Sequence, residues 1–245
     1  MLSKYSLDTE FVKETLFDRL VKSVTPKAKY LLREQYRMVR PIGDLISSTF
    51  YSGELASPNL DTIPGLDKIG KPVLWISTSK LGKTRFEENS VQGTTSHSNR
   101  TEAKLAIDRL VTLDRAIEKG LVCPPEGRKL SVLLIAPYRL QMDEIERRLS
   151  SVDLGNLEIS VQSVDAVQGR EADITVFTIT RSNIRGDLGF LRQEYWRRIN
   201  VALSRARFSL TLIGDIEFCL DQPSGLRDVA LYIRRNESDC EVRDA

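Results

Sequence analysis

Seven arginines and two acidic residues lie between positions 181 and 207, which gives this stretch a local charge of +5 (7 − 2). All of its basic residues are arginine rather than lysine, and the planar guanidinium fork makes bidentate contacts with phosphate. If residues 194–205 form a helix, Arg198 and Arg205 are seven positions apart and share one face. Such a face could present paired cations to a polyphosphate, although an ordinary exposed basic helix has the same composition.

Polar or charged residues also follow three apolar runs, at positions where strands are expected to end. These segments are residues 137–139, 165–171 and 180–183. In an open parallel sheet, ligands bind beyond the carboxyl ends of the strands. The sequence therefore predicts that the three segments meet at one edge of a sheet and form a ligand site there.

Other candidates for chemistry are weaker. Residues 82–84 read Gly-Lys-Thr, as at the end of a phosphate loop, but Ser77 stands where that motif requires a glycine. His97 is the only histidine and the three cysteines lie far apart, so neither a histidine-dependent triad nor a zinc site or disulfide framework is indicated. We therefore predict no metal site in this chain, and thiols in a reducing compartment.

The hydrophobic pattern predicts the elements that would position these residues. Apolar runs indicate strands at 73–77, 132–136, 157–164, 174–180 and 208–213. Helices are expected at 8–24, 41–51, 99–119, 140–149, 194–205 and 226–234. Asn99 and Glu102 are expected to cap the third of these helices reciprocally, and residues 52–70 and 79–97 are expected to be loops.

Strands that are apolar on both faces and alternate with helices indicate a parallel sheet covered on both sides. The chain has 245 residues, which is enough to bury a sizeable core. We therefore expect an α/β fold in a single domain over residues 1–245. Within it, residues 1–30 form a helical lead-in and residues 222–245 a C-terminal helix and tail.

Composition excludes several classes of protein. Lys plus Arg number 36 against 34 Asp plus Glu, and 41% of the residues are hydrophobic, so the chain is neither a polycation nor disordered. No stretch approaches the ~18 consecutive apolar residues of a membrane span. The first 20 residues carry seven charged side chains, unlike a secretory signal. These observations predict an intracellular protein without a membrane partner.

Five short segments form an ordered set. They are residues 32–38 (LREQYRM), 50–55 (FYSGEL), 135–138 (IAPY), 164–173 (VDAVQGREAD) and 197–207 (RRINVALSRAR). The set resembles the second core domain of superfamily 1 helicases, in the branch that contains the nonsense-mediated-decay helicase and senataxin. The resemblance implies a RecA-like lobe with the P-loop NTPase fold but no phosphate loop of its own. It also implies an N-terminal lobe that holds ATP and Mg²⁺.

The same resemblance implies roles for individual residues. Arg37 and Arg205 would be arginine fingers on the γ-phosphate. The positions implied to contact the nucleotide are Gln35, Tyr36, Gly169, Glu171 and Arg198, with Glu171 at the ribose end and Gly169 allowing close backbone approach. The positions implied to lie near single-stranded nucleic acid are Pro137, Tyr138, Ser163 and Asp165, where contacts to phosphate and sugar give weak sequence preference.

The implied function is that of the second motor lobe of an ATP-dependent helicase or translocase on RNA or DNA, inactive as an isolated chain. Two alternatives stay open at this point. One is a helicase-like nucleic-acid-binding or scaffolding module that has lost catalysis. The other is an α/β domain that uses its arginines at a protein interface and depends on neither ATP nor a nucleic-acid strand.

Overall fold

The computed structural model describes residues 19–20, 23–28, 30, 32–89 and 95–245. The chain divides into two units, Met1–Arg33 and Glu34–Ala245, which we describe separately. In the first unit, Pro26–Ala28 form one 3-10 turn, and exposed apolar side chains include Tyr30 and Leu32. Most of the predicted helix at 8–24 lies outside the described residues.

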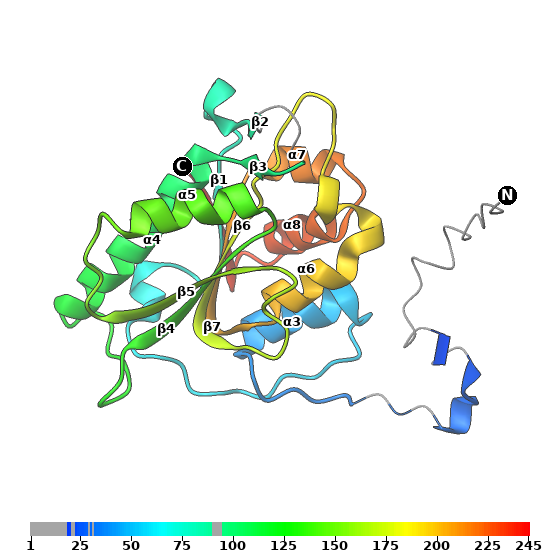
Figure 1. Ribbon diagram of the computed structural model, residues 1–245. Coiled ribbons are helices and arrows are strands. Elements are labelled where there is room, and N and C mark those ends of the chain that lie inside the picture. The colour runs from blue at the N-terminus through cyan, green and yellow to red at the C-terminus, as the bar shows by residue number, and fades with distance from the viewer. Residues whose placement is uncertain (1–18, 21–22, 29, 31, 90–94) are drawn as a thin grey trace, which may run out of the picture. The chain divides into compact units, whose positions relative to one another are not determined.

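The second unit carries the helices and strands labelled in Figure 1. The strands are β1 Val73–Ser77, β2 Glu88–Asn89, β3 His97–Ser98, β4 Leu130–Ala136, β5 Leu157–Ser163, β6 Ala172–Thr178, β7 Ala206–Gly214 and β8 Cys240–Asp244. The helices are α3 Arg40–Phe50, α4 Arg100–Glu118, α5 Arg139–Leu149, α6 Trp196–Leu203, α7 Ile216–Asp221 and α8 Gly225–Arg235. Among the residues described, no helix is both long and apolar enough to cross a bilayer.

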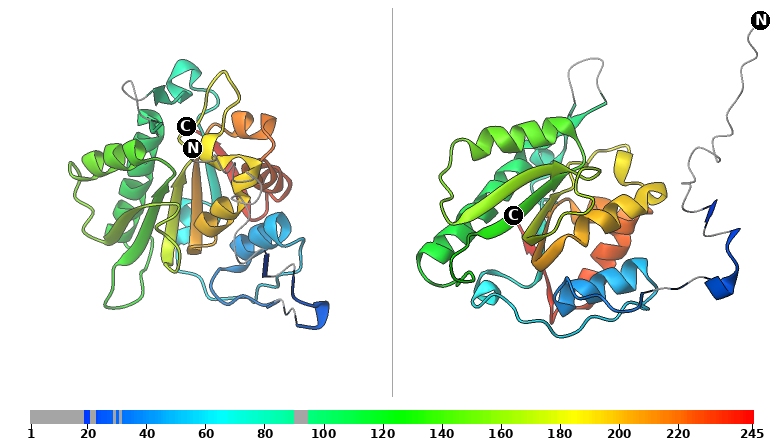
Figure 2. Two further views of the ribbon diagram at one scale, coloured as in Figure 1. Left: turned by 45° about the vertical axis from the view of Figure 1, so that its right-hand side comes forward. Right: turned by 60° about the horizontal axis from the view of Figure 1, so that its bottom comes forward.

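Six of the strands form one sheet in the order β5-β4-β6-β7-β1-β8, and every neighbouring pair is parallel. Helices α4 and α5 cover one face of this sheet, while α3, α6 and α8 cover the other (Figures 1 and 2). This confirms the predicted fold class, a RecA-like α/β sheet with helices on both faces.

Each central strand supplies both hydrophobic cores, because successive side chains of a strand point to opposite faces. In β1, Val73 and Trp75 belong to the core beneath α3, α6 and α8, whereas Leu74 and Ile76 belong to the core beneath α4 and α5. Trp75 is fully buried, and its indole N–H donates to the carbonyl of Gly214 at 3.0 Å. Burial on both faces explains why the strands appear in the sequence as unbroken apolar runs.

The predicted strands and the predicted helices within residues 34–245 are confirmed, with ends that differ by a few residues. The predicted loop 79–97 was partly wrong, since it contains the 3-10 turn Gly82–Arg85 and the short strand β2, and it ends in β3. Helix α7 and strand β8 were not predicted. Helix α7 is capped by the preceding residue, Asp215, whose carboxylate accepts from the N–H of Phe218 at 3.1 Å.

Candidate functional site

Arg37, Glu171 and Arg205 come together from three distant parts of the sequence. Nε of Arg37 donates to Oε2 of Glu171 at 3.0 Å, and Nη1 of the same guanidinium donates to the carbonyl of Ser204 at 3.2 Å. The side chains of Arg37 and Glu171 remain 38% and 50% exposed, so a ligand can reach this ion pair. We call these three residues the arginine cluster.

Arg205 is held more tightly than Arg37. Its Nε donates to the carbonyl of Val201 at 2.8 Å and its Nη1 donates to the carbonyl of Arg170 at 2.9 Å, while the residue is only 8% exposed. Burial, and next the positive charge of Arg37, lower the pKa of Arg205. Two guanidinium groups therefore face one carboxylate, Glu171, and the cluster has one uncompensated positive charge that an anion would stabilise.

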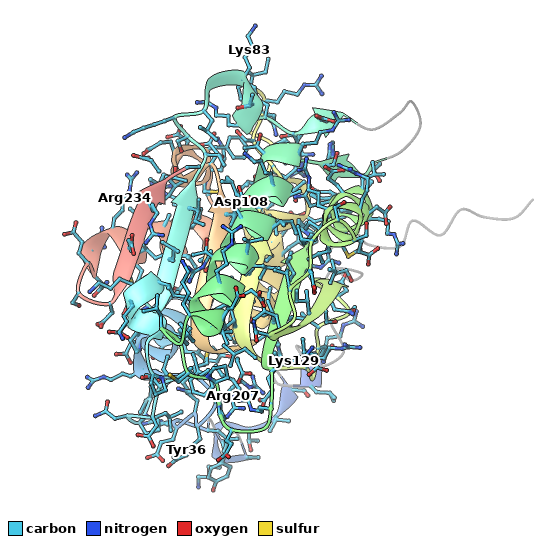
Figure 3. The ribbon with its side chains drawn as sticks, turned by 90° about the vertical axis from the view of Figure 1, so that its left-hand side faces the viewer. Tyr36, Lys83, Asp108, Lys129, Arg207 and Arg234 are labelled. Atoms are coloured by element: carbon cyan, nitrogen blue, oxygen red, sulfur yellow. The ribbon has the colours of Figure 1, made fainter. Side chains whose placement is uncertain are left out.

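The arginine cluster lies at the amino ends of the strands. Glu171 directly precedes β6 and Arg205 directly precedes β7. Figure 3 shows Arg207 and Tyr36 at one end of the sheet and Lys83, which follows β1, at the opposite end. The prediction that residues 165–171 meet the other polar segments at the carboxyl edge was therefore wrong for Glu171.

The reason is the path of the loop 164–171. It leaves the carboxyl end of β5 and enters the amino end of β6, and both of these strands run parallel to β4. No helix returns the chain across the sheet, so this loop alone spans from one edge to the other. Gly169 within it has φ +80°, which favours glycine, and a Cβ there would meet no atom within 4 Å.

Gln35 and Tyr36 stand beside the arginine cluster in the sequence but have different environments. The side-chain oxygen of Gln35 accepts from the N–H groups of Arg37 and Met38 at 2.9 and 2.8 Å, and so orders the backbone that carries Arg37. The hydroxyl of Tyr36 donates to Glu34 at 2.6 Å, and the ring is exposed. The exposed ring is available for stacking on a planar ligand.

Arg198 does not join the arginine cluster. Its Nε pairs with Oδ1 of Asp165 at 3.2 Å, and its guanidinium lies 5.5 Å from the ring centre of Phe190 and 5.0 Å from that of Tyr195. The predicted shared helical face with Arg205 was wrong, because α6 ends at Leu203 and the periodicity does not extend to Arg205.

The residues implied to lie near a nucleic-acid strand do gather at the carboxyl edge. Ala136 of β4 pairs in register with Ser163 of β5, so Pro137 and Asp165 follow neighbouring strand ends. Asp165 is exposed, and the hydroxyl of Ser163 accepts from the N–H of Ala166 at 3.2 Å. Tyr138 differs from the others because it is buried. It therefore forms the wall of a surface rather than the surface itself.

A buried polar network supports the same edge from within. The cap of α4 is confirmed on one side, since Asn99 Oδ1 accepts from the N–H of Glu102 at 3.0 Å. The reciprocal bond was wrong: the side-chain oxygen of Gln141 accepts from the N–H of Asn99, and Glu102 instead accepts from the N–H of Thr180 at 2.6 Å. Thr180 has φ +70°, and the fully buried carboxyl group of Glu102 holds this strained residue just after β6.

Arg181 follows Thr180 and is surrounded by acidic residues that sequence patterns did not single out. Its guanidinium donates to Asp187 Oδ2 at 2.9 Å and pairs with Glu87 at 3.6 Å. Burial raises the pKa of Glu87, although the charge of Arg181 opposes that shift. Glu87 and Asp187 lie in loops, where neither periodicity nor spacing marks a functional residue. In the sequence, the polar segment 180–183 was the one feature that pointed to this group of charged residues.

Burial raises the pKa of Glu102 well above its usual range. The hydrogen bond from Thr180 opposes this shift, and the negative charges of Asp215 and Glu87 reinforce it. Between the ordinary pKa of a glutamate and the raised pKa of Glu102, the native state keeps a proton that the unfolded chain loses. The stability of the native state therefore falls as the pH rises between these two pKa values. Relative to a Glu102→Gln variant, we expect the free energy of unfolding of the wild type to fall by up to about 1.4 kcal/mol per pH unit. Urea unfolding of both proteins from pH 5 to 9 measures this difference.

The control is Glu118→Gln, which changes an exposed glutamate at the other end of the same helix. Its stability relative to the wild type should not vary with pH. A difference between the wild type and Glu102→Gln that stays constant across the range would contradict the buried, protonated form of Glu102.

The Gly-Lys-Thr sequence at 82–84 lies in a single 3-10 turn, and Lys83 is exposed and points away from the sheet (Figure 3). The adjacent Arg85 pairs with Asp215 at 3.2 Å. Over the described part of the chain, no three or more His, Cys, Asp and Glu side chains are grouped as metal ligands. The Gly-Lys-Thr sequence therefore does not lead into a helix as the end of a phosphate loop would.

Comparisons with known proteins place this chain in a family. The AAA domain profile matches residues 12–217. The DNA-binding protein SMUBP-2 of Mesocricetus auratus is 33% identical over 214 residues, which are 83% of this chain and 20% of that protein. The DNA polymerase alpha-associated DNA helicase A of Saccharomyces cerevisiae is 30% identical, covering 84% of this chain and 30% of that protein. The Regulator of nonsense transcripts 1 homolog of Arabidopsis thaliana is 33% identical, covering 86% of this chain and 16% of that protein.

The parallel sheet with helices on both faces is a RecA-like α/β fold. The chain belongs to the AAA domain family. The resemblance to superfamily 1 helicases is confirmed by these relatives, of whose lengths the chain spans between 16% and 30%. A solved structure of the C-terminal domain of a possible DNA helicase from Lactobacillus plantarum aligns with a TM-score of 0.47 at 12% identity, over 85% of this chain and 98% of that one.

Proposed function

We propose that this chain is the second motor lobe of an ATP-dependent nucleic-acid helicase or translocase. Its role is to complete, from the side opposite the phosphate loop, an ATP site held by an N-terminal lobe. The observation that carries the proposal is the arginine cluster, in which Arg37 and Arg205 converge with one carboxylate between them. A triphosphate would supply the missing negative charge.

The chemistry follows from where charge develops during phosphoryl transfer. The transition state spreads negative charge over the γ-phosphoryl oxygens, and a guanidinium placed there is worth about 10³ or more in rate. Arg37 is the more mobile finger because its partners are an exposed carboxylate and one carbonyl. Arg205 is pre-positioned by two backbone carbonyls. When nucleotide binds, Glu171 would release Arg37 and contact the ribose instead.

The loop 164–171 supports a link between ATP and the nucleic-acid strand. It begins near Asp165 at the carboxyl edge and ends at Glu171 in the arginine cluster. Movement of Glu171 upon closure of the two lobes would therefore move a segment that faces the strand. Cycles of closure and release of this kind advance motor domains along a track.

The proposal includes ATP with Mg²⁺ as cofactor, the Mg²⁺ being held by the N-terminal lobe. The partners are that lobe and a single strand of RNA or DNA, and the place of action is inside the cell. Pro137, Ser163 and Asp165 would lie along the strand, with Tyr138 behind them. Contacts of this type go mainly to phosphate and sugar, so we expect little dependence on base sequence.

The isolated chain should show negligible ATP turnover, with or without an oligonucleotide, because in this proposal the phosphate loop and the Mg²⁺ ligands belong to the N-terminal lobe. The same chain joined to the N-terminal lobe of its own open reading frame should hydrolyse ATP in a strand-stimulated manner. A colorimetric phosphate assay on both proteins measures this. Robust turnover by the isolated chain, or none by the two-lobe protein, would sink the proposal and favour the scaffolding or interface alternatives.

A further inference from the structure

Three adjoining pockets form a groove across the carboxyl edge of the sheet, with volumes of about 320, 470 and 260 Å³. The first and second share His97, Arg181 and Asp187 as lining residues, and the second and third share Phe86 and Ile184. We call this surface the carboxyl-edge groove. Shared walls make it continuous, and its first pocket has the size of a site for one small planar ligand.

Charge and ring content distinguish the two ends of the groove. The third pocket is lined by three acids, Asp215, Glu217 and Asp221, against a single arginine. The first pocket has one acid, Asp187, against two arginines. It also has four rings in its wall, which are those of His97, Tyr138, Phe190 and Tyr195. A polyanionic strand therefore fits the first pocket and is repelled at the third.

The rings of the first pocket are held rigidly from behind. The centres of Tyr138 and Phe190 lie 5.5 Å apart, and those of Phe190 and Tyr195 lie 6.4 Å apart. Arg198, anchored by Asp165, lies over both Phe190 and Tyr195. Phe190 nonetheless remains 42% exposed. A large apolar ring that is both fixed in place and open to solvent is suited to stacking.

Gly189 provides the close approach that sets this geometry. It has φ +56°, and a Cβ at this position would lie 2.2 Å from the hydroxyl of Tyr138. The N–H of Phe190 donates to the same hydroxyl at 3.4 Å. Any larger residue at position 189 would push the turn that carries Phe190 away from Tyr138.

We infer that this first pocket binds one unstacked base of single-stranded nucleic acid, with the ring of Phe190 as its stacking surface. Arg192 lies at the mouth, 55% exposed, and its pairing with Asp187 at 2.6 Å leaves it able to contact the phosphate beside that base. In this inference Arg198 supports the base site. The inference rests on the proposed function only in requiring that the lobe bind a strand.

The experiment uses the full chain with a fluorescent single-stranded oligonucleotide, in separate RNA and DNA arms. Phe190→Ala should weaken binding about 5- to 150-fold, the range expected for loss of one base–aromatic stack. Phe190→Trp should restore binding, because it keeps a stacking surface. Phe86→Ala is the matched control: its ring lines only the second and third pockets, so the affinity should not change.

Photo-crosslinking with an iodouracil-containing oligonucleotide gives a readout that a purely structural role would not move. Adducts are expected on Phe190, Tyr195 or Tyr138. Tight binding that Phe190→Ala leaves unchanged, or adducts on Phe86 alone, would overturn the inference and leave the motor function intact. Binding of neither RNA nor DNA by the wild type would count against both. In the two-lobe protein, Phe190→Ala should raise the strand concentration for half-maximal ATPase while preserving the rate at saturation.

Discussion

Arg205→Ala, introduced into the protein that joins this chain to its N-terminal lobe, should lower the rate of ATP hydrolysis at saturation by about 10³-fold or more. In the proposed role, the buried guanidinium is already positioned by two carbonyls, so no reorganisation would be required when charge develops on the γ-phosphoryl group. The KM for ATP should change far less than kcat, because the interaction is strongest in the transition state. Steady-state kinetics with excess single strand measure both quantities.

Two further variants separate catalysis from folding. Arg205→Lys keeps a positive charge but loses the planar fork, so we expect it to recover little of the lost rate. Arg40→Ala removes an exposed arginine from the start of the neighbouring helix α3, where it pairs with Asp44, and should leave the rate unchanged. Thermal unfolding of each variant checks that the fold persists. A well-folded Arg205→Ala variant with an unchanged kcat would contradict the finger assignment.

The central strands could be predicted because their surroundings are uniform. In β6, the residues from Ile174 to Thr178 are all buried, and a buried strand of this kind favours apolar or small uncharged side chains on both faces. The cap of α4 was likewise visible, since Asn99 satisfies an N–H group that every helix leaves free at its start. Patterns of this kind are local, and the sequence contains them in full.

The missed elements lack such patterns. Strand β8, with Glu241, Arg243 and Asp244 among its five residues, lies at the edge of the sheet and is largely exposed beyond Cys240. Helix α7 has six residues, fewer than two full turns, so its periodicity is too short to detect. Strand β8 pairs with β1 and helix α7 packs against α8, so in both cases contacts with other elements support a segment whose own pattern is weak.

The resemblance named the residues of the arginine cluster, but the position of the cluster in the fold could not be predicted. The rule that ligands gather at carboxyl ends assumes that a helix returns the chain between parallel strands. The loop between β5 and β6 returns the chain across the sheet without a helix. Glu171, at the end of this loop, therefore lies at the amino edge beside Arg37. Glu102 is a second case in which a distant partner replaces a local one. Local rules predict that Glu102 accepts from the N–H of Asn99, but the side-chain oxygen of Gln141 accepts from that N–H instead. Long-range partners compete with local ones, and the sequence does not rank them.

Asp173→Ala should lower the free energy of unfolding by about 2 to 3 kcal/mol, which is roughly 4 to 12 °C in Tm for a domain of this size. Asp173 is 1% exposed at the amino end of β6. It accepts from the N–H and hydroxyl of Ser131 at 2.9 and 2.8 Å, and forms a bidentate pair with Arg128. Burial alone would raise the pKa of Asp173, but the bonds from Arg128 and Ser131 lower it. Removal of the carboxylate leaves the part-buried donors of Ser131 and Arg128 without this acceptor.

The matched control is Asp143→Ala, which also removes an aspartate from an arginine pair. Asp143 pairs with Arg139 one turn away on the exposed face of α5, and such a pair contributes only about 0.3 to 0.5 kcal/mol. Asp173→Asn keeps the volume and loses the charge, so it should fall between the wild type and Asp173→Ala. Equal losses in Asp143→Ala and Asp173→Ala would mean that Asp173 does not fasten β4 to β6. A large loss confined to Asp173 would identify it as the anchor at which the loop 164–171 ends, two residues beyond Glu171.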